Sequence, residues 1–447
     1  MGSLIPPVLD AEDVVWLRDQ EELPTAARVA AASLARRIGF DEQRCAEVAL
    51  AVSEAATNLR KHAVDGAFLL RTVRTPSDAG LEFVTTDEGP GMADVAYSLA
   101  DGTSTSGTLG IGLGAISRLA DFFDLHSLPG RGTVLTARFW TKEAARRFAA
   151  QGSPVVEGLT RAITGEDVCG DAWAARRAGV PADGGSDRRQ ARTLSSAAPP
   201  EDPLGWAQLT GFRRTADGSR HADGLRHTDD RLYADGSRRT DDRLYADGSR
   251  RTDDRLYTDG SRHQAPAPAD VRAGSGADEP ALLVLFCDGL GHGPLAGRAA
   301  QAAVAAFHGS DAQQPDAILM DVHKALRGGR GGAVAVVRIE PGDQSVYFCG
   351  VGNVSTFVVD PATGTRRSLS SAPGIVGHHL PTLRSVRQEL PRDGAVIMHS
   401  DGLTERWQAT ALPGFLEHSP LVAAAQLLRE AGVRRDDAGV VVAKGPW

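Results

Sequence analysis

The spacing of apolar residues predicts one long helix near the N-terminus and a set of short buried strands further along. Between residues 41 and 63, apolar side chains recur three and four positions apart, which places them on one face of a helix. They are Cys45, Val48, Val52, Ala55 and Leu59. Short apolar runs near residues 83, 282, 395 and 440 have the length of buried strands, and most lie next to an Asp-containing turn. The chain therefore mixes helices and strands in more than one folded region.

A polar tract from about residue 183 to 279 interrupts this pattern. The unit DGSRRTDDRLYA begins at Asp235 and again at Asp247, with a degenerate copy from Asp223 and a truncated one at Asp259. Each complete unit offers one Leu and one Tyr, too little apolar surface to offset the entropy of ordering. We predict a disordered insertion that grew by tandem duplication. A Ca²⁺-binding repeat would need a different Asp spacing, and a tether for a partner protein is a further alternative.

Composition narrows the class of protein. The 447 residues suffice for two or three domains, and the net charge of -8 provides no basic stripe, which argues against nucleic acid as a partner. The four cysteines are too far apart for a zinc knuckle or a CxxC pair, so we expect a reduced, cytoplasmic protein. No apolar run reaches the length of a membrane span, and the N-terminus lacks the features of a secretory signal.

Two polar residues of the long helix are candidates for nucleotide chemistry. Glu54 and Asn58 lie one turn apart and share a face other than the apolar one. An amide oxygen can bind Mg²⁺, and a carboxylate can position or deprotonate an attacking group. Such a pair alone is more often a solvated helix face, so its meaning depends on the motifs that follow.

Glycine-rich loops after the helix supply those motifs. Asp87 ends an apolar strand, where it can accept a hydrogen bond from an exocyclic amine such as that of adenine. Nearby glycines permit a close approach of the backbone to a ligand, and a second glycine cluster precedes a predicted helix, where free N–H groups suit phosphates. In chain order these residues are Asp87, Gly89, Gly91, Gly107, Gly110, Gly112, Gly114, Gly132 and Thr133.

In this order and spacing, the residues resemble the GHKL-type ATPase fold, and within it the small anti-sigma and switch kinases of the RsbW and RsbT type. The resemblance covers about residues 12–140, in a domain that we place at 10–145. It implies an α/β sandwich that binds Mg-ATP and phosphorylates Ser or Thr of a STAS-domain anti-anti-sigma protein. The implied roles are general base for Glu54, Mg²⁺ ligand for Asn58, ATP binding for Asp87, Gly89, Gly91 and Thr133, and a phosphate lid of Gly110, Gly112 and Gly114.

Acidic residues mark the ends of several apolar strands in the second region. Asp288 and Asp401 each follow an apolar run, Asp436 precedes a Val-rich one, and Asp171 opens a further plausible strand. One Asp at a strand end is usually a turn residue. Several such residues suggest carboxylates that converge on hard cations such as Mg²⁺ or Mn²⁺. Two such ions about 3.5–4 Å apart can activate water toward a phosphoryl group.

The segments CGDAW, CDGLGHG, GVGNV, HSDGLTERW and DDAGVVV resemble the metal-dependent PPM-type protein phosphatases of the SpoIIE and RsbX branch. The resemblance implies an α-β-β-α sandwich over residues 153–447, two Mn²⁺ or Mg²⁺ ions, and hydrolysis of phosphoserine or phosphothreonine. By position, the first ion would take Asp288, Asp401 and Asp436. The second would take Asp171, Asp288 and the Gly289 carbonyl.

Three further positions in this region have open meanings. His292 follows Asp288 in the same loop, where it could protonate a leaving seryl oxygen or only make a loop hydrogen bond. Gly439 stands where the family has Thr. Arg161 is a guess for the phosphate-binding arginine. If Asp171 lies on the strand that pairs with residues 281–286, the repeat tract is an insertion inside the phosphatase domain, which loop-closure entropy tolerates.

We therefore predict an α+β protein of two domains with opposing activities. The second would dephosphorylate STAS-domain or stressosome-type proteins, and the first would phosphorylate them, in a partner-switching pathway that controls a sigma factor. An alternative is that the first domain is a non-catalytic module that senses nucleotide or binds a partner. A second alternative is a scaffold with an inactive phosphatase. No nucleic acid or membrane is expected as a partner.

Overall fold

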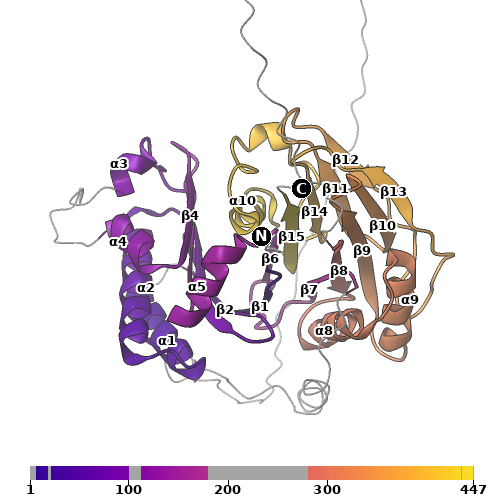
Figure 1. Ribbon diagram of the computed structural model, residues 1–447, viewed down its shortest axis with the longest axis horizontal. Coiled ribbons are helices and arrows are strands. Elements are labelled where there is room, and N and C mark those ends of the chain that lie inside the picture. Colours follow the sequence, from indigo (N-terminus) through magenta and orange to yellow (C-terminus); the bar gives the residue numbers. More distant parts are fainter. Residues whose placement is uncertain (1–6, 19–21, 100–111, 180–279, 434, 446–447) are drawn as a thin grey trace, which may run out of the picture. The chain divides into compact units, whose positions relative to one another are not determined.

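The computed structural model describes residues 7–18, 22–99, 112–179, 280–433 and 435–445, all within one compact unit. The repeat tract at 183–279 and Gly110 lie outside these residues. Both domains contain helices and strands (Figure 1), which confirms the predicted mixed architecture. Within the described part of the chain, no helix has the length and apolar character needed to cross a bilayer.

The elements of the N-terminal domain are, in chain order, β1 (Asp10–Arg18), α1 (Leu23–Arg37), α2 (Glu42–His62), β2 (Ala67–Arg74), β3 (Ala79–Thr86), α3 (Val95–Leu99), α4 (Gly112–Leu119), β4 (Phe122–Ser127), β5 (Thr133–Phe139) and α5 (Lys142–Gln151). Those that follow are β6 (Val156–Arg161), β7 (Asp171–Arg177), β8 (Leu282–Gly289), α8 (Pro294–Gly309), α9 (Pro315–Leu326), β9 (Gly332–Glu340), β10 (Ser345–Val351), β11 (Ser355–Val359), β12 (Arg366–Leu369), β13 (Val386–Glu389), β14 (Ala395–His399), the 3₁₀ turn η1 (Ala409–Ala411), α10 (Pro420–Ala431) and β15 (Ala438–Lys444).

The N-terminal domain is a five-stranded antiparallel sheet in the order β1-β2-β3-β5-β4, with α1 and α2 on one face (Figure 1). Successive side chains of a strand point to opposite faces. Phe68 and Leu70 accordingly pack with α1 and α2, whereas Leu69 packs with residues of α10. This sheet is therefore covered on both faces, which accounts for the nearly continuous burial of β2 and β3.

Helix α2 forms where the apolar spacing predicts it. Asp41 caps its N-terminus by accepting a hydrogen bond from the backbone N–H of Arg44 at 2.7 Å. The predicted apolar face, from Cys45 to Leu59, is buried in the core against the sheet. Glu54 and Asn58 lie between these positions and are only partly buried, so both can meet a ligand.

The second domain contains two stacked five-stranded sheets. One has the order β12-β11-β14-β15-β6, and the other has the order β13-β10-β9-β8-β7. Apolar side chains from both sheets form the core between them. Helices α8 and α9 cover the outer face of the second sheet, and α10 covers the outer face of the first. The layers therefore follow the predicted α-β-β-α order.

Strands β7 and β8 are antiparallel neighbours, although about a hundred residues separate them in the chain. Asp171 lies opposite Asp288 at one end of the pair. At the other end, the Ala178 N–H donates to the Ala281 carbonyl at 2.7 Å. Residues 180–279 thus connect two adjacent strands of one sheet, and the exact bounds of the insertion stay a prediction.

Four charged side chains are buried between the N-terminal sheet and β6. The sequence pattern did not predict this cluster. Glu82 accepts from Arg71 and from Arg138, each at 2.7 Å, across neighbouring strands. Arg138 also pairs with Glu157 of β6, and Arg71 donates to the Gly158 carbonyl at 2.7 Å. Each of the four buried ionisable groups thus contacts a group of opposite type, as burial requires.

Glu157→Gln is expected to make the free energy of unfolding less dependent on pH. Burial raises the pKa of Glu157 from 4.5 to about 7, although Arg138 attracts its charged form. The folded chain then keeps a proton that the unfolded chain releases above pH 4.5, so the stabilisation is present at low pH and is lost as the pH rises through 7. Denaturant unfolding at pH 4.5 and 7.5 should show the difference between wild type and variant falling by about 2–3 kcal/mol. A difference that stays constant or grows would contradict this prediction.

Candidate active sites

Acidic side chains gather at the end of the β7–β8 pair. Asp171 is 4% exposed and lies in register with Asp288 on the neighbouring strand. Asp401 follows β14, and Asp436 and Asp437 lie in the loop between α10 and β15. Strands from both sheets thus deliver carboxylates to one region, although the five residues span most of the chain.

Burial and mutual repulsion raise the pKa of Asp171, Asp288 and Asp401. Burial raises the pKa of Asp288 to about 7, with further contributions from Asp401, Asp436 and Asp437. Burial and the Asp288 charge hold the pKa of Asp171 well above its ordinary value. Burial, with the nearby Asp436, also raises the pKa of Asp401. The carboxylates therefore repel one another, and this repulsion disfavours their charged form.

A cation would relieve this repulsion. The Oδ1 atom of Asp171 is buried and has no hydrogen-bond partner, and carboxylate oxygens are the ligands that Mg²⁺ and Mn²⁺ prefer. The donor chemistry and the charge of the cluster therefore fit divalent cations. Within the described residues, no three His, Cys, Asp or Glu side chains stand at metal-site spacing, so the acids would have to draw closer around a cation.

Neighbouring polar groups hold three of the acids in place. The Ser400 hydroxyl donates to Asp171 Oδ2 at 2.6 Å, and the Asn353 amide donates to Asp401 Oδ2 at 2.7 Å. Asp437 accepts from the backbone N–H groups of Ile163 and Gly170, each at 2.7 Å. The sequence reasoning assigned no role to Ser400, Asn353 or Asp437, although all three lie in or beside the quoted motifs.

The glycine at position 439 has a steric explanation. A Cβ atom there would lie 2.9 Å from the Cβ of Asp171 and 2.8 Å from the ring of Phe286. The Gly439 N–H donates to the Ser400 hydroxyl at 3.0 Å, and that hydroxyl in turn donates to Asp171. The space that a threonine would need is therefore occupied, and Ser400 supplies a hydroxyl to Asp171 in this chain.

Ser400→Ala is expected to weaken activation by Mn²⁺ by about 10–100-fold, the usual cost of losing a partner that orients a ligand. The side chain of Asp171 would lose its hydroxyl donor, and the Gly439 N–H would lose its acceptor. Titration of phosphatase activity with Mn²⁺ measures the change. Ser371→Ala, which removes a hydroxyl bonded to the Val354 carbonyl, should leave the titration unchanged. Equal titrations for wild type and Ser400→Ala would contradict the role of Ser400.

The remaining predicted phosphatase residues lie around the same strand ends. Gly289 ends β8, and its N–H donates to the Gly170 carbonyl at 3.0 Å. His292 is exposed, and its Nδ1 lies 3.3 Å from an oxygen of Glu166, a residue that the sequence reasoning missed. Arg161 ends β6 and donates to the Val433 carbonyl at 3.4 Å. His292 therefore makes the loop contact that the sequence allowed for, with Glu166 as its partner.

The predicted adenine-binding residue is held by its own loop. Asp87 Oδ1 accepts from the Gly89 N–H at 2.8 Å, and the Asp87 N–H donates to the Thr133 carbonyl at 3.0 Å. Burial raises the pKa of Asp87, against the Gly89 N–H and the Arg429 charge. A Cβ at Gly132 would lie 1.9 Å from the Asp87 carbonyl oxygen, so only glycine fits this approach.

This loop runs beside the end of α2. A Cβ at Gly89 would lie 2.6 Å from the His62 carbonyl, and the Glu88 N–H donates to the Val64 carbonyl at 2.8 Å. Asn58 lies one turn before His62 on the same helix. The structure therefore brings the loop of Asp87 to the helix that carries Glu54 and Asn58.

Other glycines of the predicted ATP site differ in their setting. Gly91 has a φ of 65°, and a Cβ there would lie 2.0 Å from the Leu128 carbonyl. Thr133 uses its hydroxyl on Ser127 at 2.9 Å. The prediction that Gly112 and Gly114 precede a helix is wrong, because both lie in the first turn of α4. Gly112 can begin the helix there because its φ of 67° suits glycine.

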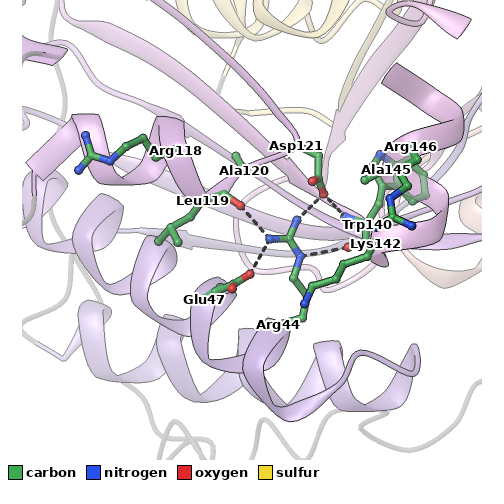
Figure 2. Close-up of a pocket in the computed structure, with 10 residues that line it drawn as sticks. All are labelled: Arg44, Glu47, Arg118, Leu119, Ala120, Asp121, Trp140, Lys142, Ala145 and Arg146. Carbon is green, nitrogen blue, oxygen red and sulfur yellow. Dashed lines mark hydrogen bonds and ion pairs between the residues drawn. The ribbon is translucent and has the colours of Figure 1, made fainter. Parts of the chain in front are cut away.

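A cavity of about 310 Å³ lies elsewhere in the N-terminal domain, near the start of α2 and α5 (Figure 2). Arg44 is one of its lining residues and donates to Glu47 at 2.8 Å, to the Leu119 and Trp140 carbonyls and to Asp121. None of the candidate catalytic residues lines it. These satisfied ion pairs give the cavity a structural explanation.

Each of the two domains matches a known protein family. Residues 17–139 match the family "Histidine kinase-like ATPase domain", and residues 278–444 match "Stage II sporulation protein E (SpoIIE)". The serine/threonine-protein kinase RsbT of Bacillus subtilis (strain 168) is 37% identical over 117 residues, which cover 26% of this chain and 88% of RsbT. The predicted resemblances, and the prediction of an enzyme with phosphatase and kinase domains, are confirmed.

The solved structures that are similar to this chain include RsbX and a part of SpoIIE. RsbX in complex with magnesium has 20% sequence identity and a TM-score of 0.33, covering 39% of this chain and 89% of RsbX. The PP2C phosphatase domain of SpoIIE from Bacillus subtilis, with a fragment of its regulatory domain, has 11% identity and a TM-score of 0.36, covering 83% of this chain and 80% of that one.

Proposed function

Since the chain belongs, through its N-terminal domain, to the family of the serine/threonine-protein kinase RsbT and carries a SpoIIE domain behind it, we propose a regulatory enzyme with two opposing activities. The C-terminal domain removes phosphate from Ser or Thr of a STAS-domain protein. The N-terminal domain phosphorylates such a protein with Mg-ATP. The balance sets the state of a partner-switching circuit that ends in a sigma factor.

The observation that carries the phosphatase proposal is the pairing of Asp171 with Asp288 across β7 and β8. Asp401 and Asp436, from other strands, contribute to the raised pKa of Asp288 and so share its surroundings. A chance arrangement of turn residues would not place four acids from four chain segments within mutual electrostatic reach.

The carboxylates would divide between two Mn²⁺ or Mg²⁺ ions. One ion would bind Asp288, Asp401 and Asp436, and the other would bind Asp171, Asp288 and the Gly289 carbonyl. When bound, such ions supply Lewis-acid activation of water and of the phosphoryl oxygens.

The surrounding side chains of the chain position the acids and handle the proton. Ser400 orients Asp171, and Asn353 orients Asp401. His292 would donate a proton to the departing seryl oxygen, with Glu166 beside its Nδ1 atom. His292 is exposed in a loop, where a phosphorylated protein surface can reach it.

In the N-terminal domain, the geometry supports phosphotransfer. Asp87 would accept a hydrogen bond from the adenine amino group, Asn58 would bind Mg²⁺, and Glu54 would take the proton of the attacking hydroxyl. Gly110, Gly112 and Gly114 would cover the phosphates. Asn58 and Glu54 lie on α2, whose end contacts the Asp87 loop.

The test is an assay with a panel of STAS-domain proteins from the same genome. The full chain with Mn²⁺ should release phosphate from at least one phosphorylated member, and labelled ATP should transfer phosphate to an unphosphorylated one. Phosphate release without transfer, in a chain that binds ATP, would favour the non-catalytic ATPase module. Failure to release phosphate from every member and from p-nitrophenyl phosphate would contradict the phosphatase assignment.

A further inference from the structure

Helix α10 belongs to the phosphatase domain by sequence, yet it packs on both domains. Apolar side chains of α10 share one buried cluster with Val440 and Val442 of β15. The same cluster includes Val84 and Val134 from the N-terminal sheet. Almost every residue of this helix is buried, so a shift of α10 cannot occur without repacking both neighbours.

The first turn of α10 is fixed by the N-terminal domain. Asp124 of β4 accepts from the backbone N–H of Ser419 and from His418 Nδ1, each at 2.7 Å. Ser419 in turn caps the helix by accepting from the Val422 N–H at 3.3 Å. These hydrogen bonds tie the start of α10 to β4, so that a movement of β4 would also move the start of the helix.

The last turn of α10 reaches the predicted nucleotide site. The side chain of Arg429 is 7% exposed, and its Nη1 donates to the Asp87 carbonyl at 3.2 Å. Asp87 is thus held at three points. Its backbone N–H donates to the Thr133 carbonyl, its side chain accepts from the Gly89 N–H, and its carbonyl accepts from Arg429. Arg429 is the charged member of this set and comes from the other domain.

The same helix end anchors the predicted metal loops. The Ala431 carbonyl accepts from the Thr404 N–H at 2.8 Å, and the Val433 N–H donates to the Gly402 carbonyl at 2.7 Å. Gly402 directly follows Asp401, and Asp436 lies three residues after Val433. Arg429, which contacts Asp87, thus lies only two positions before Ala431, whose carbonyl accepts the first of the hydrogen bonds that position the Asp401 turn.

We propose that Arg429 positions Asp87 for adenine binding, and that α10 thereby couples nucleotide binding in the N-terminal domain to cation binding in the phosphatase domain. This inference rests on the proposed adenine-binding role of Asp87. Coupling of two binding sites is reciprocal, so each ligand must change the affinity of the other by the same factor.

The first experiment compares binding of the non-hydrolysable analogues AMP-PNP and GMP-PNP to the full chain. Guanine lacks the exocyclic amine at the position that Asp87 would recognise, so correct positioning of Asp87 should favour AMP-PNP. Arg429→Gln is expected to weaken AMP-PNP binding about tenfold, in line with the loss of one charge-assisted hydrogen bond, and to change GMP-PNP binding by less than about twofold. Arg429→Lys, which keeps a charged donor, should fall between the wild type and Arg429→Gln.

The control is Arg338→Gln, which removes an arginine bonded to Glu340 and the Gln313 carbonyl inside the phosphatase domain. It should bind both analogues as the wild type does. Loss of selectivity by Arg429→Gln cannot come from general destabilisation, because a partly unfolded chain would lose affinity for both analogues equally.

The second experiment measures activation of p-nitrophenyl phosphate hydrolysis by Mn²⁺, with and without saturating AMP-PNP. The wild type should show at least about a fivefold change in apparent Mn²⁺ affinity, the lower end of typical coupling. Arg429→Gln should show less than about twofold. Asp87→Asn, measured at the same AMP-PNP concentration, corrects for Mn²⁺ bound by free nucleotide.

The outcomes separate this inference from the proposed function. A wild type that prefers AMP-PNP, with an Arg429→Gln variant of equal preference, would overturn the inference and leave the nucleotide site standing. A phosphatase whose Mn²⁺ affinity ignores AMP-PNP would overturn the coupling. A wild type that binds neither analogue would remove the proposed adenine site and the inference with it.

Discussion

Asp288→Asn is expected to lower kcat/KM for p-nitrophenyl phosphate with Mn²⁺ by more than about 100-fold, the upper cost of losing a partner that only orients a ligand. Asp288 is the residue that both proposed cation sites share, and the amide has nearly the same size but no charge. The substitution also removes a buried like charge opposite Asp171, so the variant without metal should be at least as stable as the wild type.

Two measurements separate these effects. Steady-state hydrolysis gives the loss of activity, and thermal unfolding in EDTA gives the stability. Asp343→Asn is the matched control, because Asp343 is an exposed acid in the turn between β9 and β10 of the same domain. It should keep wild-type activity. An Asp288→Asn variant with more than a tenth of wild-type activity, or one that melts at a lower temperature in EDTA, would contradict the carboxylate cluster as the active site.

Glu54→Gln is expected to reduce transfer of labelled phosphate to a STAS-domain protein by about 10²–10⁴-fold, the usual contribution of a general base. Binding of AMP-PNP should change by less than about twofold. Glu54 lies on a partly buried face of α2, away from the core positions Ala55 and Leu59, so the amide should not disturb folding. The ratio of transfer to binding therefore reports chemistry alone.

The control for this variant is Glu42→Gln, at the exposed start of the same helix. It makes the same carboxylate-to-amide change three turns from the candidate base, and transfer should persist. Should Glu54→Gln transfer phosphate at the wild-type rate, the base would have to be sought elsewhere. A parallel loss of AMP-PNP binding would instead place Glu54 in nucleotide or Mg²⁺ binding.

Much of this architecture is readable from local patterns. An apolar run that stops at Asp-Gly predicts a buried strand whose carboxylate emerges at its end, and β8 bears this out with Asp288 beside Gly289. The helical spacing from Cys45 to Leu59 likewise predicts the buried face of α2. These features depend on residues a few positions apart, so one sequence contains the whole signal.

Other features depend on contacts between distant segments. Glu82 and Arg138 have the pattern of ordinary polar strand positions, and they become buried because β6 and α10 pack on this face of the sheet. Ser400 gains its meaning from Asp171, 229 residues away. Arg429 sits in an unremarkable helix turn until the Asp87 loop is placed beside it. No periodicity or motif spacing encodes such pairs.

The placement of β6 and β7 has a practical consequence for dissecting the protein. The SpoIIE match begins at residue 278, yet β6 and β7 form the outermost strand of each phosphatase sheet and precede that point. A fragment that begins at residue 278 would lack Asp171. It would also leave an unpaired edge strand in each of the two sheets, and such edges favour aggregation. If Asp171 binds a cation as proposed, the active site needs a residue from the amino-terminal side of the repeats, and an excised SpoIIE segment is expected to be inactive.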